Sequence, residues 1–201
     1  MSLKKIKRIK RIFTVLFITV SIISIACCLI AFASLSSTHS LNLNNTFTVN
    51  IPPNISYEKA DYVISKEITQ HYILQGSDDY SSINGYIQVW NLKSPITDYI
   101  KQAEENLSAS VYNYEKKPVL QNGSTGFDIS FAIKGDNGNT FVRQTIWQRD
   151  NNMYVISLSA PDNTEQIAIL DEVFDKIKKS VTLSGDSLPS GKLVEYCIQD
   201  I

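Results

Sequence analysis

The feature that most constrains this chain of 201 residues is an uncharged apolar stretch, Ile12 to Leu35, that directly follows a basic leader. The stretch is rich in Ile, Phe, Val, Leu and Ala, and the leader, residues 1–11, carries six Lys and Arg side chains. A helix over the stretch, rising about 1.5 Å per residue, would be roughly 36 Å long, against a hydrocarbon core of about 30 Å. Residues 12–35 therefore predict a transmembrane helix or signal segment, and the lipid bilayer is the first partner that the sequence indicates.

The position of the basic residues predicts the orientation of this segment. Lys and Arg beside a spanning segment favour the cytoplasmic side of the membrane. The leader contains six of them, and no Lys or Arg follows the apolar stretch until Lys59. We expect a single-pass protein of the cell membrane, with its N-terminus in the cytoplasm and its C-terminal domain outside the cytoplasm.

Two alternatives to a retained transmembrane helix at residues 12–35 stay open. Residues 31–33, Ala-Phe-Ala, have the small-x-small form that precedes signal cleavage, so the chain could be cut after Ala33. Cys27 could instead be lipidated, although Ser24 is unusual before such a cysteine and the chain stays apolar beyond it. The length of the apolar stretch favours a retained anchor, because the apolar part of a cleaved signal usually spans about 7–15 residues.

Charge is distributed unevenly along the chain. All 20 acidic residues follow the apolar stretch, together with 13 of the 19 Lys and Arg, so this part carries a net charge of −7. The net charge of −1 for the whole chain hides this asymmetry. Because an acidic domain repels phosphate backbones at long range, we expect no nucleic-acid partner.

The residues beyond the apolar stretch suffice for one domain with its own core. Residues 36–46 are rich in Ser, Thr and Asn, which is typical of a flexible linker. We expect the folded domain at 47–183 and a C-terminal tail at 184–201, in which residues 192–201 could add an edge strand. Cys197 is the single cysteine of this part, so no internal disulfide is possible there, and we expect a free, partly buried thiol.

Alternation of apolar and polar residues predicts the strands of the domain. The clearest runs are three consecutive ones joined by Asn-rich turns, which predict a three-stranded antiparallel meander. A polar loop is expected at 76–82. The predicted strands are 47–51, one or two within 61–75, then 85–90, 127–134, 140–149 and 154–160.

Two amphipathic helices are predicted beside these strands. The first begins at Ser94-Pro95, which suits a helix start, and extends to about residue 109. The second follows Pro161-Asp162 and ends near residue 181, with acids early and lysines late, as the helix dipole favours. The fold class that follows is α+β: a transmembrane helix, then one domain with an antiparallel sheet packed by two main helices.

Three passages resemble the PsbP-like family, which is named for an extrinsic subunit of the oxygen-evolving photosystem. Residues 47–52 look like its opening strand and proline, 153–161 like its last central strand, and 169–181 like its final helix. The likeness spans about residues 47–183 and departs at 53–55, where the family usually has an aromatic residue. It implies an α/β/α sandwich, and bacterial members that are often exported or membrane-anchored. It implies no shared active site, no metal and no photosynthetic role.

The sequence lacks the spacings that mark common catalytic and cofactor sites. The eight glycines have no phosphate-loop or dinucleotide spacing, and no serine lies in a nucleophile elbow. His39 and His71 are too few for a multi-histidine metal site, and the Asp and Asn clusters at 78–79 and 136–139 lack EF-hand spacing. We therefore expect no catalytic residue, no cofactor and no metal ligand, in a non-enzymatic protein.

Trp90 and Tyr86 are the candidate binding residues. Trp90 shares a face of strand 85–90 with polar Gln88, so we expect an aromatic side chain at the surface, suited to recognition. The first hypothesis is a binding or scaffold module for another envelope protein. One alternative is an envelope hydrolase acting on carbohydrate, with a deep cleft lined by acidic groups of raised pKa. Another is a small-ligand or lipid carrier, with an apolar cavity between sheet and helix.

Overall fold

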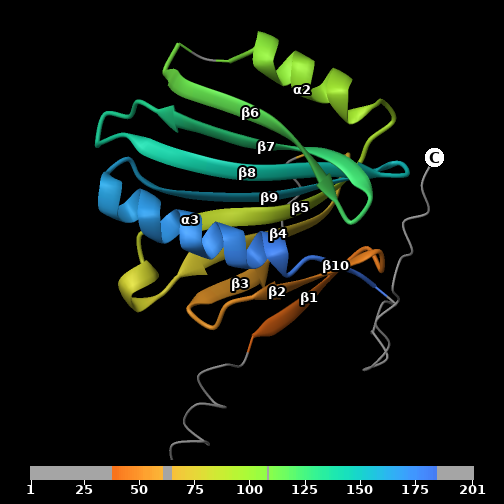
Figure 1. Cartoon of the computed structure of the whole chain (residues 1–201), viewed down its shortest axis with the longest axis horizontal. Coiled ribbons are helices and arrows are strands. Elements are labelled where there is room, and N and C mark those ends of the chain that lie inside the picture. The colour runs from red at the N-terminus through yellow and green to blue at the C-terminus, as the bar shows by residue number, and fades with distance from the viewer. Residues whose placement is uncertain (1–37, 61–64, 108, 185–201) are drawn as a thin grey trace, which may run out of the picture. The chain divides into compact units, whose positions relative to one another are not determined.

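A computed structural model describes residues 38–60, 65–107 and 109–184 of the chain (Figure 1). The leader, the predicted transmembrane segment at 12–35, the alternatives at Ala33 and Cys27, and the tail with Cys197 lie outside the described residues. The chain divides into two units, Met1–His39 and Ser40–Ile201, and the fold below is that of the second. Among the helices of the described ranges, none has the length and apolar character needed to cross a membrane.

A seven-stranded antiparallel sheet forms the framework of this unit. Its strand order is β3-β4-β5-β9-β8-β7-β6. The predicted meander is confirmed as β7, β8 and β9, in which Ile133 pairs with Thr140 and Arg149 with Asn152 at the two turns. The strands are β3 (Ile55–Lys59), β4 (Ile68–Gly76), β5 (Asn84–Asn91), β6 (Val111–Gln121), β7 (Ser124–Ile133), β8 (Thr140–Arg149) and β9 (Asn152–Pro161).

A smaller sheet combines the start and the end of the described chain. It contains β1 (His39–Leu43), β2 (Phe47–Ile51) and the short β10 (Thr182–Leu183), in the order β1-β2-β10. The expected linker at 36–46 therefore needs a correction, because residues 39–43 form a strand. Leu41 and Leu43 alternate with polar neighbours and are buried, which outweighs the polar composition of the segment.

Both predicted helices are present, and they lie on opposite faces of the large sheet (Figure 1). Helix α2 (Ile96–Glu105) ends before the expected residue 109, and α3 (Thr164–Lys179) begins after Asn163, whose side chain accepts a hydrogen bond from the backbone N–H of Gln166. Successive residues of a strand point to opposite faces, and Tyr154 and Val155 of β9 accordingly belong to separate cores. Tyr154 packs in the larger core under α3, and Val155 in the smaller one under α2.

The larger core lies between the seven-stranded sheet, α3 and the small sheet. At its centre the rings of Trp147 and Tyr154 stack 5.3 Å apart, and the ring of Phe47 meets both edge-on, at 5.5 and 4.8 Å. Such ring pairs stabilise a core by about 0.5–1.5 kcal/mol each beyond their buried area. Phe174 of α3 is also fully buried here, beneath the Arg143 guanidinium, whose carbon lies 4.9 Å from the ring centre. This side of the sheet is therefore closed by packing.

Phe174→Ala should destabilise the domain by about 3–5 kcal/mol, because truncation removes a fully buried ring and leaves a cavity. Urea unfolding of the full-length chain, followed by tryptophan emission, measures the change. Leu120→Ala is the matched control, because Leu120 is 73% exposed and its truncation should change the free energy of unfolding by less than about 0.5 kcal/mol. Equal effects of the two substitutions would contradict the assignment of this core.

Candidate ligand-binding pocket between α2 and the sheet

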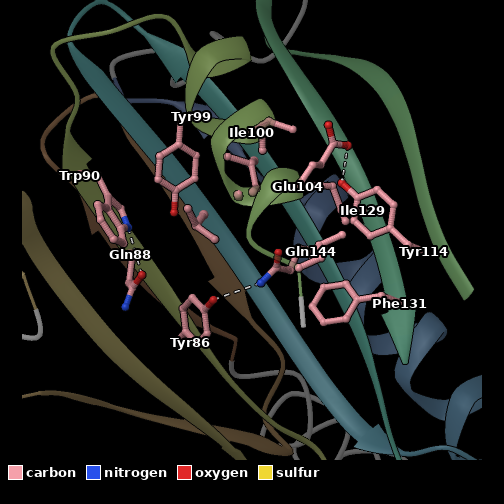
Figure 2. Close-up of a pocket in the computed structure, with 14 residues that line it drawn as sticks. Tyr86, Gln88, Trp90, Tyr99, Ile100, Glu104, Tyr114, Ile129, Phe131 and Gln144 are labelled. Atoms are coloured by element: carbon pink, nitrogen blue, oxygen red, sulfur yellow. Dashed lines mark hydrogen bonds between the residues drawn. The ribbon is translucent and has the colours of Figure 1, made fainter. Parts of the chain in front are cut away.

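The face of the sheet that α2 covers contains a pocket of about 180 Å³. Its walls come from α2 on one side and from the α2-facing side chains of β5 to β9 on the other, as Figure 2 shows. Aromatic side chains from four different elements line it: Tyr86 and Trp90 of β5, Tyr99 of α2, Tyr114 of β6 and Phe131 of β7. The pocket is therefore a feature of the assembled fold and not of any single segment.

Strand β5 supplies one wall through its alternation. Tyr86, Gln88 and Trp90 line the pocket, whereas the intervening Ile87 and Val89 are buried in the larger core. The Trp90 indole N–H donates to Gln88 Oε1 at 3.0 Å, and the rings of Trp90 and Tyr99 lie 5.8 Å apart. These contacts orient Trp90 along the strand and toward α2.

The structure places both sequence-predicted binding residues in the lining of this pocket. Trp90 and Tyr86 are half-buried, so they form a pocket wall and not the exposed surface patch that the sequence indicated. That a ligand binds to them stays a prediction. His71 of β4 pairs with Gln88 across the strands and meets the Tyr86 ring edge-on at 6.1 Å, which extends the same wall. His39 begins β1 and is exposed.

The opposite wall depends on a β-bulge in β6. The pairing of β6 with β7 shifts between Tyr112 and Glu115, and Asn113 adopts a positive φ of 51°. Tyr112 and Tyr114, two residues apart, consequently face opposite sides of the sheet: Tyr112 donates to Asp162 beside α3, whereas Tyr114 lines the pocket. Without the bulge the two tyrosines would share one face, and the pocket would lose this wall.

Glu104 ties the C-terminal end of α2 to β6. Its Oε1 accepts a hydrogen bond from the Tyr114 hydroxyl at 2.9 Å and forms an ion pair with Lys116 Nζ at 2.6 Å. The Lys116 contact, with a second contribution from Tyr114, lowers the pKa of Glu104 below its ordinary value. The carboxylate therefore stays ionised near neutral pH, with its charge balanced by Lys116.

Gln144 of β8 forms the polar floor of the pocket. Its Nε2 donates to the Tyr86 hydroxyl and to Ser157 Oγ, both at 3.1 Å. Figure 2 shows the side chain between Tyr86 on one side and Phe131 on the other. Both hydrogen bonds use one end of the amide, and within the described ranges no residue bonds to Oε1 at the other end.

Burial raises the pKa of each of the three tyrosines of the pocket: Tyr86, Tyr99 and Tyr114. For Tyr114 the neighbouring Glu104 carboxylate adds to the rise. All three phenols therefore keep their protons across the physiological range. The pocket presents neutral hydroxyl and amide groups between aromatic rings, with one charge-balanced carboxylate at its edge.

Sequence reasoning missed several residues of this site, each for an identifiable reason. Tyr99 lies on the predicted helix, but the face it shares with the sheet depends on how the helix docks. Tyr114 lies on β6, a strand that the sequence did not predict. The Asn-Gly dipeptide at 122–123, which joins β6 to β7 with φ values of 48° and 77°, is the signal that could have revealed that hairpin.

Comparisons with known proteins support the fold alone. No protein-family model matches the chain, and no curated protein is significantly similar to it in sequence. The solution structure of the cyanobacterial PsbP protein CyanoP from Synechocystis is similar, with a TM-score of 0.51 at 11% identity, over 74% of this chain and 93% of that chain. This likeness shows that the chain has a PsbP-like fold, as the sequence resemblance implied.

Two further solved structures have lower scores. The Ran-binding protein Mog1p of Saccharomyces cerevisiae aligns with a TM-score of 0.46 at 9% identity, over 74% of this chain and 96% of that chain. LpqN of Mycobacterium tuberculosis, described as involved in cell envelope biogenesis, aligns with a TM-score of 0.41 at 8% identity, over 73% of this chain and 90% of that chain.

Lys116→Met should raise the pKa of Glu104 toward its ordinary value of 4.5, because it removes the largest cause of the lowered pKa. Carbon NMR titration of the Glu104 carboxyl measures the change. A lowered folded-state pKa contributes stability above the unfolded-state pKa, and this contribution is lost as the pH falls through the folded-state pKa. The pH dependence of stability in this acidic range should therefore weaken in the variant.

Lys117→Met is the control for this titration, because Lys117 follows Lys116 on β6 but pairs with Glu115, and not with Glu104. It should leave the pKa of Glu104 where it is in the unmodified chain. An unchanged pKa in Lys116→Met, or an equal rise in both variants, would contradict the ion pair that ties α2 to β6.

Proposed function

We propose that this chain is a membrane-anchored, prokaryotic member of the PsbP-like family, and that its extracytoplasmic domain is a non-enzymatic binding module for another component of the envelope. Residues 12–35 hold the chain in the lipid bilayer, with the N-terminus in the cytoplasm. The pocket between α2 and the sheet is the recognition site. The basic leader and the uncharged stretch of the sequence support the location, and the pocket supports the binding role.

The observation that carries the binding role is the combination of groups in the pocket. Five aromatic rings and two glutamine amides from distant parts of the chain converge on one cavity. Aromatic side chains provide large contact area at low entropic cost, and a few placed polar groups give orientation and specificity. These groups can hold a ligand by hydrogen bonds and ring contacts, because the tyrosines are neutral and Glu104 is paired with Lys116.

The carbohydrate hydrolase fits this pocket less well. A glycosidase needs two carboxyl groups flanking the scissile bond, one of them with a raised pKa so that it can act as an acid. Among the described residues that line the pocket, Glu104 is the one carboxylic acid, and its pKa is lowered. Its Oε1 also already accepts from Tyr114 and contacts Lys116.

The lipid carrier is favoured by one observation, since the pocket does lie between a helix and the sheet. The groups inside it argue against an acyl chain, however. Tyr99 and the free ends of the Gln88 and Gln144 amides would all lose contact with water beside a ligand that offers them no hydrogen bond, which costs free energy for each group. A ligand with polar atoms of its own is the better match.

Ala103→Phe should weaken recognition, because Ala103 is an exposed residue of the pocket lining on α2, and a phenyl ring there obstructs the entry of a ligand. The full-length chain is extracted from membranes with a mild detergent, and native mass spectrometry measures the envelope component that co-purifies with it. We expect the variant to retain about tenfold less of this component, or still less, than the unmodified chain. Recovery of the unmodified chain from the membrane fraction, with its domain open to protease from outside the cytoplasm, is expected from the same preparation.

Ala168→Phe provides the control, because Ala168 is exposed on α3, on the other side of the sheet. It makes the same change of side chain on the second helix and should leave the bound component in place. A chain that purifies alone, or a component retained equally by both variants, would refute the role of the pocket.

A further inference from the structure

We infer that the pocket binds one uncharged sugar ring, as a single accessible unit of an envelope carbohydrate. This inference rests on the proposed function, and names the chemistry of its ligand. Four properties of the pocket lead to it: unused hydrogen-bonding groups, neutrality, aromatic faces and size.

The first property is that polar groups inside the pocket have hydrogen-bonding capacity to spare. The Gln144 amide bonds Tyr86 and Ser157 through one end, and Gln88 accepts from the Trp90 indole through Oε1. Within the described ranges, no residue bonds to the other end of either amide or to the Tyr99 hydroxyl, which Figure 2 shows pointing toward the sheet. A ligand must supply hydrogen-bonding atoms to all three groups or leave them desolvated without partners.

The second property is neutrality. The tyrosine hydroxyls keep their protons, the amides are uncharged, and the charge of Glu104 is matched by Lys116 at 2.6 Å. An anion entering the pocket would meet this carboxylate, and a cation would compete with Lys116 for it. An uncharged ligand avoids both costs.

The third property is the arrangement of the rings. Trp90 and Tyr99 lie 5.8 Å apart on one side of the pocket, and Tyr114 and Phe131 lie 6.4 Å apart on the other. The face of an aromatic ring carries partial negative charge, so it attracts the weakly positive C–H groups of a sugar ring. The hydroxyls at the edge of that sugar ring are then free to reach Gln144, Gln88 and Tyr99.

The fourth property is size. The pocket measures about 180 Å³, and an apolar cavity on the order of 150 Å³ holds one benzene molecule. The enclosed space therefore limits the ligand to one ring, and the hydroxyls of a sugar ring that exceed this space lie toward the exposed part of the lining, which includes Leu107 at 42% exposure. The side chain of a peptide Phe, Tyr or Trp would also fit the one-ring limit, but it brings at most one polar atom for three unused groups.

The two tryptophans of the chain make the test direct, because Trp90 lines the pocket and Trp147 is fully buried in the other core. We would titrate the full-length chain, in a detergent without a sugar headgroup, with methyl glucoside, methyl mannoside and N-acetylglucosamine, and record tryptophan emission. At least one should give a saturable change below about 50 mM, the weak range expected of a one-ring ligand. Cyclohexanol, p-cresol and glucuronate test an apolar ring, an aromatic side chain and a charged sugar.

Variants locate the binding. Tyr99→Phe removes one hydroxyl and keeps the ring, and it should weaken sugar binding severalfold. Gln144→Leu should weaken it about tenfold or more. Gln102→Leu, the same change at an exposed position of α2, should have no effect. In Trp90→Phe the emission change should disappear, because the remaining Trp147 lies in the core on the other side of the sheet.

The outcomes separate this inference from the proposed function. Saturation by p-cresol or cyclohexanol with none of the three sugars would overturn the sugar assignment, and so would sugar binding that Gln144→Leu and Tyr99→Phe leave unchanged. If no sugar binds, while Ala103→Phe still releases a co-purifying component, the sugar assignment fails and the binding role stands. If Ala103→Phe releases nothing and no probe binds, both fail.

Discussion

The register of β5 against β9 decides which side chains enter each of the two cores and which line the pocket. This pairing joins two parts of the chain that are distant in sequence, the β3-β4-β5 strands and the β6-β9 strands, through residues 84–91 and 152–159. In this register Val89 lies opposite Tyr154 and Gln88 opposite Val155, so each face of the sheet receives one set of side chains. A slip by one residue would send Trp90, Gln88 and Tyr86 into the core under α3 and bring Ile87 and Val89 to the pocket.

The two faces of the sheet are closed to different degrees, and this difference creates the pocket. Helix α3 buries four side chains, Leu170, Val173, Phe174 and Ile177, and the small sheet completes the core around it. Helix α2 buries Ile96 and Ile100. Side-chain contacts hold its two ends: the Ile96 N–H donates to Gln148 Oε1 at 2.7 Å, and Glu104 contacts Tyr114 and Lys116. The helix is thus held above the sheet near its ends, and aromatic side chains line the space between.

Periodicity revealed the elements whose burial is one-sided and regular. The meander, both helices, β2 and β5 all follow from alternation or from helical spacing, and β2 ends before Pro52-Pro53 as proline chemistry requires. Strand β6 was not predicted, because it is an edge strand and can be polar on both faces. It contains Lys116, Lys117 and Pro118 and is paired on one side only. Strand β1 was predicted as part of a linker because its composition is polar, although burial of two leucines is enough to fix this five-residue strand on the core.

The site could be predicted only in part for a related reason. Trp90 and Tyr86 were recognisable, because both lie on one strand whose polar face was evident. Gln144 and Tyr114 join the same pocket only through strand order, and Tyr114 also needs the bulge at Asn113. The local pattern of a sequence indicates neither strand order nor the position of a bulge, so it does not reveal a pocket whose lining comes from six elements.

The proposed binding role requires that a ligand occupies the space between α2 and the sheet. A crystal structure of the full-length chain, purified from its own membranes, tests this most directly. We expect density for a bound group between the Trp90–Tyr99 and Tyr114–Phe131 pairs, in contact with Gln144. A helix α2 lying flat on the sheet, with Tyr99 and Trp90 filling the space themselves, would contradict it.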